Sequence, residues 1–201
     1  MSEDRLGRAV GAIIRVGGGR GFVIRNPLSY PHLVVTAAHC LPHLPPPHLG
    51  SYTEERTYAG LLGPLGDAPS TAWAECLFVD PVADLAVLMC PDNQEPDLGS
   101  DAYEALVESM TPVPVRAAKE GAAWVPGLDG RWFRCDVKGV GSPLWIESVE
   151  PIVGGMSGSP IIQAGAAIGV VCMSTSGGTG QGAHLALDLP RRLTQRPRRP
   201  R

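Results

Sequence analysis

The sequence predicts an all-β protein made of two packed six-stranded antiparallel barrels. Two observations carry this prediction. The 201 residues include 25 Gly and 20 Pro but only 5% aromatic residues, which is typical of short strands joined by tight turns. Short apolar runs then recur along the chain, and Pro112 and Pro114 divide them six and six. Six short strands on either side of such a boundary suit a pair of small barrels.

The first half contains six runs that we expect to be strands. They cover 10–16, 21–24, 33–36, 57–62, 73–79 and 85–89. The third of them, Leu33-Val34-Val35-Thr36, is rich in β-branched residues. Residues 41–50 contain four prolines and two histidines and are expected to form a loop. Residues 101–110 favour a brief helix, which Pro112 and Pro114 prevent from continuing.

The second half repeats the number of strands without a detectable sequence repeat. Its expected strands cover 122–125, 132–137, 144–147, 160–163, 167–173 and 183–187. We therefore expect an N-terminal barrel in 1–110, a C-terminal barrel in 111–190, and a short C-terminal helix or a basic Pro/Arg tail or linker in 191–201.

Charge is distributed unevenly along the chain. The net charge is −3, but six arginines lie in the last eleven positions, so 11 Lys and Arg remain against 20 Asp and Glu before them. A nucleic-acid-binding domain normally presents a basic face, and this body is acidic. The sequence therefore indicates no nucleic-acid partner, and the Pro/Arg end is interpreted as a solvated tail or linker.

The localisation expected from the sequence is cytoplasmic. The N-terminus opens acidic and lacks the apolar stretch of a secretory signal. The apolar run from Ile161 to Met173 is interrupted and shorter than the ~20 residues that span a bilayer, so no membrane association is expected. The five cysteines are odd in number, widely spaced and mostly in apolar surroundings, which is typical of buried free thiols in a reducing compartment.

Three segments contain residue types that commonly act in catalysis. They are Thr36-Ala37-Ala38-His39-Cys40 after the third strand, Asp84-Leu85-Ala86-Val87-Leu88 opening the sixth, and Gly154-Gly155-Met156-Ser157-Gly158-Ser159-Pro160 before a strand of the second half. A glycine-serine turn alone is weakly specific. The ordered occurrence of a histidine, an aspartate 45 residues later and a serine 73 residues after that is much more specific.

In this order the segments resemble the signatures of the chymotrypsin-like (trypsin-like) serine protease family, over nearly all of residues 10–190. The Gly21-Phe22-Val23-Ile24 run and the serine turn are similar to bacterial trypsin-like and HtrA-like peptidase domains, although no PDZ-sized segment follows. The resemblance implies two six-stranded barrels with the site between them, a protein or peptide substrate, and no metal or cofactor.

The resemblance gives each motif residue a catalytic role. Ser157 is the expected nucleophile, because a hydroxyl activated by an adjacent base can attack a carbonyl carbon. His39 is the expected base and later the acid, and Asp84 holds the imidazole in the required tautomer. The backbone N–H groups of Gly155 and Ser157 are expected to form the oxyanion hole, which needs a tight turn without a bulky side chain.

Residues for substrate binding are also carried over from the resemblance. Cys172, Met173 and Ser174 align with the strand that pairs with the substrate backbone. His184 aligns with a strand lining the specificity pocket, where a histidine favours acidic residues; a surface or core histidine is the alternative. Pro151, at the expected pocket base, brings no charge.

Several residues depart from the family pattern or compete for these roles. Met156 stands where zymogen-type relatives have an aspartate, so activation by N-terminal clipping is not expected. Cys40 would have its disulfide partner near Ile24, where no cysteine occurs. Ser159 and Asp80 are interpreted as structural turn residues. His32, His43 and His48 are interpreted as solvated loop residues because no partner with metal-ligand spacing accompanies them.

The leading hypothesis is an intracellular bacterial serine endopeptidase that works through an acyl-enzyme intermediate. A regulatory partner domain or protein, in a stress or defence system, would restrain it in place of a zymogen switch. The alternative from another class is a non-catalytic peptide-binding module on the same fold, a pseudoprotease. An esterase with the same triad is a third interpretation.

Overall fold

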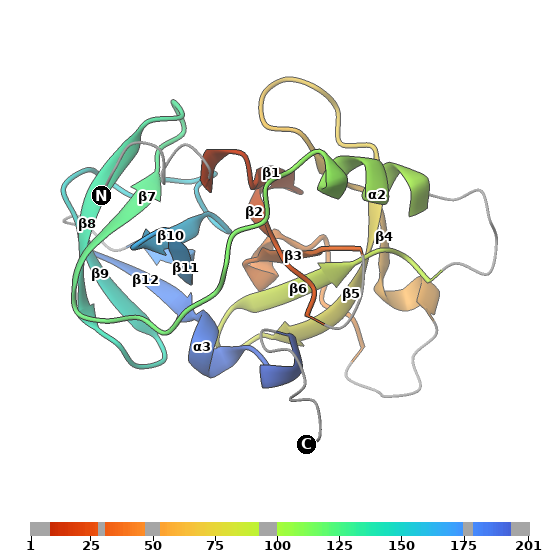
Figure 1. The fold of residues 1–201 in the computed structure, drawn as a ribbon. Coiled ribbons are helices and arrows are strands. Elements are labelled where there is room, and N and C mark those ends of the chain that lie inside the picture. The colour runs from red at the N-terminus through yellow and green to blue at the C-terminus, as the bar shows by residue number, and fades with distance from the viewer. Residues whose placement is uncertain (1–8, 28–30, 47–52, 93–99, 175–178, 194–201) are drawn as a thin grey trace, which may run out of the picture.

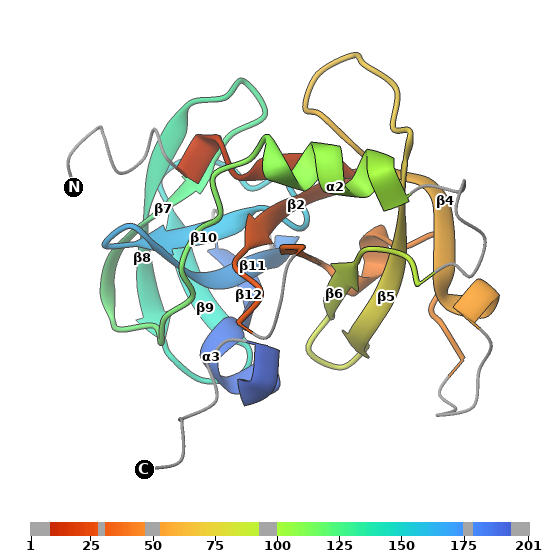
Figure 2. The same ribbon diagram turned by 45° about the vertical axis from the view of Figure 1, so that its right-hand side comes forward.

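Strands dominate the architecture, and the helices are few and short. The computed structural model describes residues 9–27, 31–46, 53–92, 100–174 and 179–193, and in these residues twelve strands close into two antiparallel barrels. The barrels stand side by side, with red to yellow strands in one and green to blue strands in the other (Figures 1 and 2). The predicted fold class is confirmed.

The first barrel runs in the order β1-β2-β3-β6-β5-β4. Its strands are β1 (Ile13–Val16), β2 (Gly19–Ile24), β3 (Leu33–Thr36), β4 (Thr57–Gly63), β5 (Ala72–Asp80) and β6 (Leu85–Met89). The barrel closes where Arg15 of β1 pairs with Gly63 of β4. The short helices η1 (Ala38–Cys40) and η2 (Thr53–Arg56) connect strands, and η1 follows β3 directly.

The second barrel has the order β7-β8-β9-β12-β11-β10, which repeats that of the first. Its strands are β7 (Gly121–Pro126), β8 (Trp132–Gly139), β9 (Leu144–Ser148), β10 (Pro160–Gln163), β11 (Ala166–Ser174) and β12 (Thr179–His184). The barrel closes where Ile162 of β10 pairs with Trp124 of β7. The two halves therefore share one topology although their sequences show no repeat.

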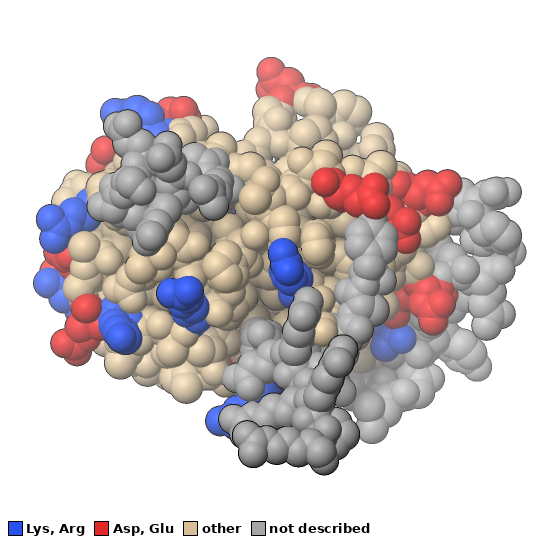
Figure 3. Space-filling model, in the orientation of Figure 1, with Lys and Arg blue, Asp and Glu red and all other residues tan. Residues whose placement is uncertain are grey.

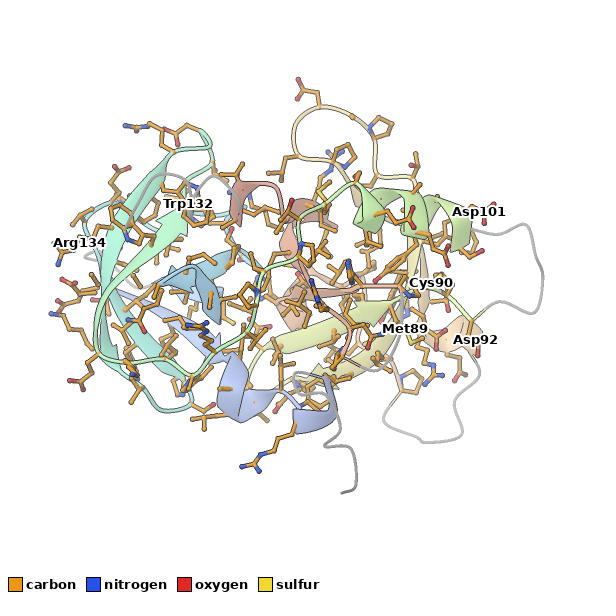
Figure 4. All side chains as sticks on the ribbon, viewed as in Figure 1. Met89, Cys90, Asp92, Asp101, Trp132 and Arg134 are labelled. Carbon is orange, nitrogen blue, oxygen red and sulfur yellow. The ribbon has the colours of Figure 1, made fainter. Side chains whose placement is uncertain are left out.

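Alternation of apolar and polar residues explains how the second barrel fills its interior. In β8, Phe133, Cys135 and Val137 are buried whereas Arg134 is exposed. Successive side chains of a strand point to opposite faces, so the first three enter the barrel. Figure 4 shows Arg134 on the outside of this barrel.

Helix α2 (Ser100–Glu108) covers one side of the first barrel. Its Tyr103 is fully buried, and the hydroxyl donates to the carbonyl oxygens of His32 and Leu88 at 2.8 and 3.2 Å. Figure 3 shows acidic side chains gathered over this helix, and Asp101 is labelled at its start in Figure 4. No helix within the described ranges is both long and apolar enough to cross a bilayer.

Two segments tie the barrels together. The segment after α2 passes along their junction, where Val113 bridges to Ile24 of β2 and Val115 bridges to Ala167 of β11 (Figure 1). After β12 come α3 (Leu185–Asp188) and η3 (Arg191–Leu193), and Leu193 is buried in a hydrophobic cluster that includes residues of both barrels. The chain up to Leu193 is thus packed, and the remainder of the expected tail lies outside the described residues.

The predicted strands agree with the structure except at two places. The first strand begins at Ile13 rather than residue 10, because Ala12 N closes a turn onto Ala9 O. The last predicted strand, 183–187, is wrong, since the strand ends at His184 and a helix follows. The Asp188 carboxylate accepts a hydrogen bond from His184 N at 2.6 Å, which stabilises the start of that helix.

Candidate active site

His39 and Asp84 come together beside the ends of β3 and β6. His39 lies in η1, and Asp84 directly precedes β6. Asp84 Oδ2 accepts a hydrogen bond from His39 Nδ1 at 2.6 Å, and Oδ1 accepts one from the His39 backbone N–H at 2.9 Å. Both carboxylate oxygens therefore bind the same residue, which fixes the imidazole plane and leaves Nε2 as the free ring nitrogen.

The backbone conformation at Asp84 orients this carboxylate toward His39. Asp84 has φ +54°, a left-handed conformation that few residues other than glycine adopt, and its carbonyl accepts from Ala38 N at 3.2 Å. The His39 side chain is 50% exposed and that of Asp84 28%. The backbone therefore fixes the pair in place while its side chains remain accessible to a bound molecule, which suits a general base.

Ser157 lies in a double turn that precedes β10. Met156 N donates to Val153 O at 3.2 Å, and Ser159 N donates to Met156 O at 3.0 Å. Each turn has a glycine with positive φ at its third position, Gly155 at +86° and Gly158 at +82°. This is the type II geometry, which glycine adopts without steric cost.

The double turn leaves two backbone donors unused. The N–H groups of Met156, Gly158 and Ser159 each donate to a backbone carbonyl. Among the residues that the structure describes, those of Gly155 and Ser157 donate to none. These are the two N–H groups that the sequence assigns to the oxyanion hole, and a developing negative charge is what such donors stabilise.

Contacts across the junction dock this turn onto the first barrel. Arg20 N of β2 donates to Ser157 O at 2.7 Å, and Arg20 O accepts from Thr36 Oγ1 at 2.7 Å. A methyl group on Gly158 would lie 1.7 Å from Arg20 O, so only glycine fits there. Ser157 is thus held against β2 at Arg20, which Thr36, the last residue of β3 before His39, contacts in turn.

Cys40 lies under the same junction as a buried free thiol, and burial raises its pKa. The expected disulfide partner position near Ile24 is wrong. The residue facing Cys40 is Gly19, where a methyl group would lie 2.6 Å from Cys40 Sγ. Gly19 and Ile24 lie at opposite ends of β2, so the position that faces Cys40 is the start of this strand rather than its end.

The predicted substrate strand has one edge that, among the described residues, no other strand covers beyond Val170. In β11, Met173 pairs with Gln181 and Ser174 with Gly180 of β12, but pairing with β10 ends at Val170. Cys172 Sγ donates to Asp84 O at 3.3 Å, so this edge begins beside the His39–Asp84 pair. A cavity of about 340 Å³ lies between Asp84 and Met173, and Met173 is 58% exposed.

His184 has a different environment from the other predicted substrate residues. It is buried, and its Nε2 accepts a hydrogen bond from Ala118 N, in the segment that joins the barrels, at 3.1 Å. This contact is that of a core histidine, the alternative left open by the sequence. Its role in substrate binding stays a prediction.

The competing residues take structural positions. Asp80 Oδ1 accepts hydrogen bonds from Val82 N and Ala83 N, as expected of a turn aspartate. Ser159 is fully buried. Met156 is buried in the second barrel, where its sulfur accepts from Val153 N at 3.4 Å. No group of three metal-ligating side chains occurs in the described part of the chain.

The two barrels have the fold of chymotrypsin-like serine proteases. The serine endoprotease of Yersinia pestis is 17% identical with a TM-score of 0.58, over 93% of this chain and 64% of that one. The NSP4 proteinase of Equine Arteritis Virus is 18% identical with a TM-score of 0.56, and the match covers 85% of this chain and 70% of that one. The serine protease domain of the Sesbania Mosaic Virus polyprotein is 13% identical with a TM-score of 0.55, over 90% of this chain and 92% of that one. This chain thus spans less than two thirds of the Yersinia protein. No family model and no curated protein matches the sequence.

Proposed function

We propose that the protein is a serine endopeptidase whose triad is His39, Asp84 and Ser157. The observation that carries the proposal is the doubly hydrogen-bonded and partly exposed His39–Asp84 pair, together with a serine turn that has two unused N–H donors and docks at Gly19, beside Cys40. A carboxylate on Nδ1 leaves the Nε2 lone pair available for a proton, which is the requirement for a base that activates a hydroxyl.

The proposed reaction uses each of these groups in turn. Ser157 Oγ attacks the carbonyl carbon of a peptide bond as its proton passes to His39 Nε2, and the N–H groups of Gly155 and Ser157 stabilise the oxyanion. His39 then gives the proton to the leaving amine, and a water molecule hydrolyses the acyl-enzyme by the same route. The edge of β11 beyond Val170 supports binding of the substrate main chain as an added strand.

The proposal extends to the setting of the protein. All five cysteines are free thiols, which supports a reducing compartment such as the bacterial cytoplasm. We propose a protein or peptide as substrate and a partner domain or protein as the regulator, because a protease without a clipping switch needs another restraint.

A fluorophosphonate probe tests the proposal, because it reacts only with an activated serine. The wild type is expected to be labelled, and Ser157→Ala and His39→Ala are not. Ser159→Ala is the matched control, since it removes a buried hydroxyl from the same turn and should leave labelling intact. Equal labelling of Ser157→Ala refutes the triad. An unlabelled wild type that still binds peptides supports the pseudoprotease instead.

A further inference from the structure

A buried arginine of the first barrel reaches into the second. Arg20 of β2 is only 8% exposed. Its Nη1 donates to Gly127 O at 3.0 Å and Pro126 O at 3.4 Å, and its Nη2 donates to Leu128 O at 3.4 Å. No ion pair with a carboxylate accompanies it in the described residues. Burying a guanidinium is costly, so these three bonds to one loop indicate a specific role.

The loop that Arg20 holds is the turn between β7 and β8. This turn is closed by its own hydrogen bond, from Gly127 N to Arg131 O at 2.7 Å. Among the described residues, the side-chain hydrogen bonds that it receives from the first barrel come from Arg20. Burial lowers the pKa of Arg20, and the nearby Asp129 carboxylate acts in the opposite direction. The guanidinium therefore fixes the position of the loop relative to β2.

Leu128 connects this loop to the serine turn. A methyl group on Gly155 would lie 3.5 Å from Leu128 Cδ2, which is ordinary van der Waals contact, so Leu128 packs beside that glycine. Leu128 is also 53% exposed and lines a cavity of about 320 Å³ together with Arg20, Val10, Ile13 and Leu65.

Arg20 also holds the serine turn, through its backbone. Arg20 N donates to Ser157 O, and Arg20 O lies against Gly158. The Gly155–Ser157 segment is thus held on one side by the Arg20 main chain and on the other by Leu128, which the Arg20 side chain positions. We propose that Arg20 is a positioning residue that holds the oxyanion turn in its productive geometry through the Pro126–Gly127–Leu128 carbonyls.

This inference rests on the proposed hydrolysis and makes a prediction about how kinetics change. Oxyanion donors act mainly in the transition state, so a displaced donor lowers kcat and kcat/KM by the same factor. A misplacement of about 1 Å is worth up to ~100-fold in rate. Replacing Arg20 by Met keeps the length of the side chain and removes the three bonds, so kcat is expected to fall about 10- to 100-fold with KM little changed.

The test compares Arg20→Met with Arg15→Met. Arg15 is the cross-strand neighbour of Arg20, and its Nε and Nη2 make no hydrogen bond within the described part of the chain, so its loss should change kcat by less than about threefold. Rates are divided by the concentration of active sites from fluorophosphonate titration. Affinity for a peptide aldehyde, which forms an oxyanion with Ser157, should fall with kcat/KM in Arg20→Met and stay unchanged in Arg15→Met.

Two further variants keep the test decisive if Arg20→Met folds poorly. Arg20→Lys retains a buried cation with fewer donors and should recover part of the lost kcat. Leu128→Ala removes a half-exposed side chain, and its effect should be less than additive with that of Arg20→Lys if both act on Gly155.

The outcomes separate the inference from the proposed function. An active wild type with equal kcat and aldehyde affinity in Arg20→Met and Arg15→Met overturns the role of Arg20 and leaves the protease intact. Fully additive effects of Arg20→Lys and Leu128→Ala also overturn it. A wild type that neither hydrolyses peptides nor reacts with the probe overturns both.

Discussion

The two barrels share one strand order but hold their catalytic side chains differently. The first barrel supplies both bonds to the Asp84 carboxylate, from the ring and the backbone N–H of His39, while Cys172 of the second barrel contacts only the Asp84 carbonyl oxygen. The second barrel holds Ser157 on a double turn, and two of the contacts that fix this turn come from β2 of the first barrel. The orientation of the base is therefore set within its own barrel, whereas the turn of the nucleophile is also held by the neighbouring barrel.

This difference predicts two distinct effects of substitutions on catalysis. Changes within the His39–Asp84 pair should impair proton transfer and leave the serine turn in place. Changes where the turn meets β2 should displace the oxyanion donors and weaken the junction of the barrels together. The variants below test that division, beginning with the largest expected loss.

Asp84→Asn should reduce kcat by about 10⁴-fold at neutral pH, the size of effect known for this substitution in triads. The wild-type carboxylate accepts from both the ring and the backbone N–H of His39. An amide has one acceptor and one donor, so either the backbone bond is lost or Nδ1 must become the acceptor, which places the ring proton on Nε2. Steady-state kinetics on a peptide substrate measures the loss.

Asp80→Asn serves as the control for this change. Its Oδ1 accepts both turn hydrogen bonds, and an asparagine oxygen can keep them, so activity should stay within about twofold. A loss for Asp80→Asn as large as that for Asp84→Asn would show that the aspartates act through folding rather than proton transfer. The melting temperatures of both variants should remain close to that of the wild type.

Gly158→Ala should lower kcat by about 10² to 10³-fold, the effect of losing one oxyanion donor. The new methyl group would meet Arg20 O at 1.7 Å and would stand on a residue with φ +82°, so the turn must move. The strain should also destabilise the protein by about 1–3 kcal/mol. Kinetics and thermal unfolding of the same sample give both values.

Gly154→Ala is the matched control in the same turn. No atom of the described residues lies within 4 Å of the position its methyl group would take, and Gly154 is not among the glycines with positive φ. Its activity and stability should match the wild type. If Gly158→Ala is equally harmless, the turn does not depend on β2, and the contrast between the barrels fails.

This contrast also explains how far the sequence could predict the site. The order and number of strands, and the segments carrying His39, Asp84 and Ser157, follow from short local patterns. The role of Gly155 and Gly158 could be anticipated because positive φ selects glycine. Each of these predictions depends on residues close together in the chain.

Features that depend on contacts between distant residues could not be predicted. Arg20 stands between two glycines in a strand, and nothing in that pattern indicates that its guanidinium reaches residues 126–128. The helix at Leu185 forms where a strand was expected because Asp188 binds His184 N and Leu185 is fully buried in a hydrophobic cluster shared by the two barrels. Gly19, and not a residue near Ile24, faces Cys40, because this contact depends on how β2 packs against the segment that follows β3.

The smallest effect concerns stability at alkaline pH and compares the barrels directly. Burial raises the pKa of Cys76, in the first barrel, to about 11 and that of Cys135, in the second, to about 12, from an ordinary value of 9.0. Above pH 9 the unfolded thiols lose protons that the folded ones keep, so the free energy of unfolding falls as pH rises toward 11 or 12. Each thiol contributes at most about 1.4 kcal/mol per pH unit to that slope.

Removing either thiol should therefore flatten the pH dependence. Denaturant unfolding of Cys76→Ala and Cys135→Ala between pH 9 and 11 should each give a shallower slope than the wild type, while activity near neutrality is kept. Because the serine turn docks on β2, we expect one unfolding transition that senses both thiols. Two transitions, each responding to one variant only, would mean that the barrels unfold separately, and the nucleophile would then need no support from its neighbour to stay folded.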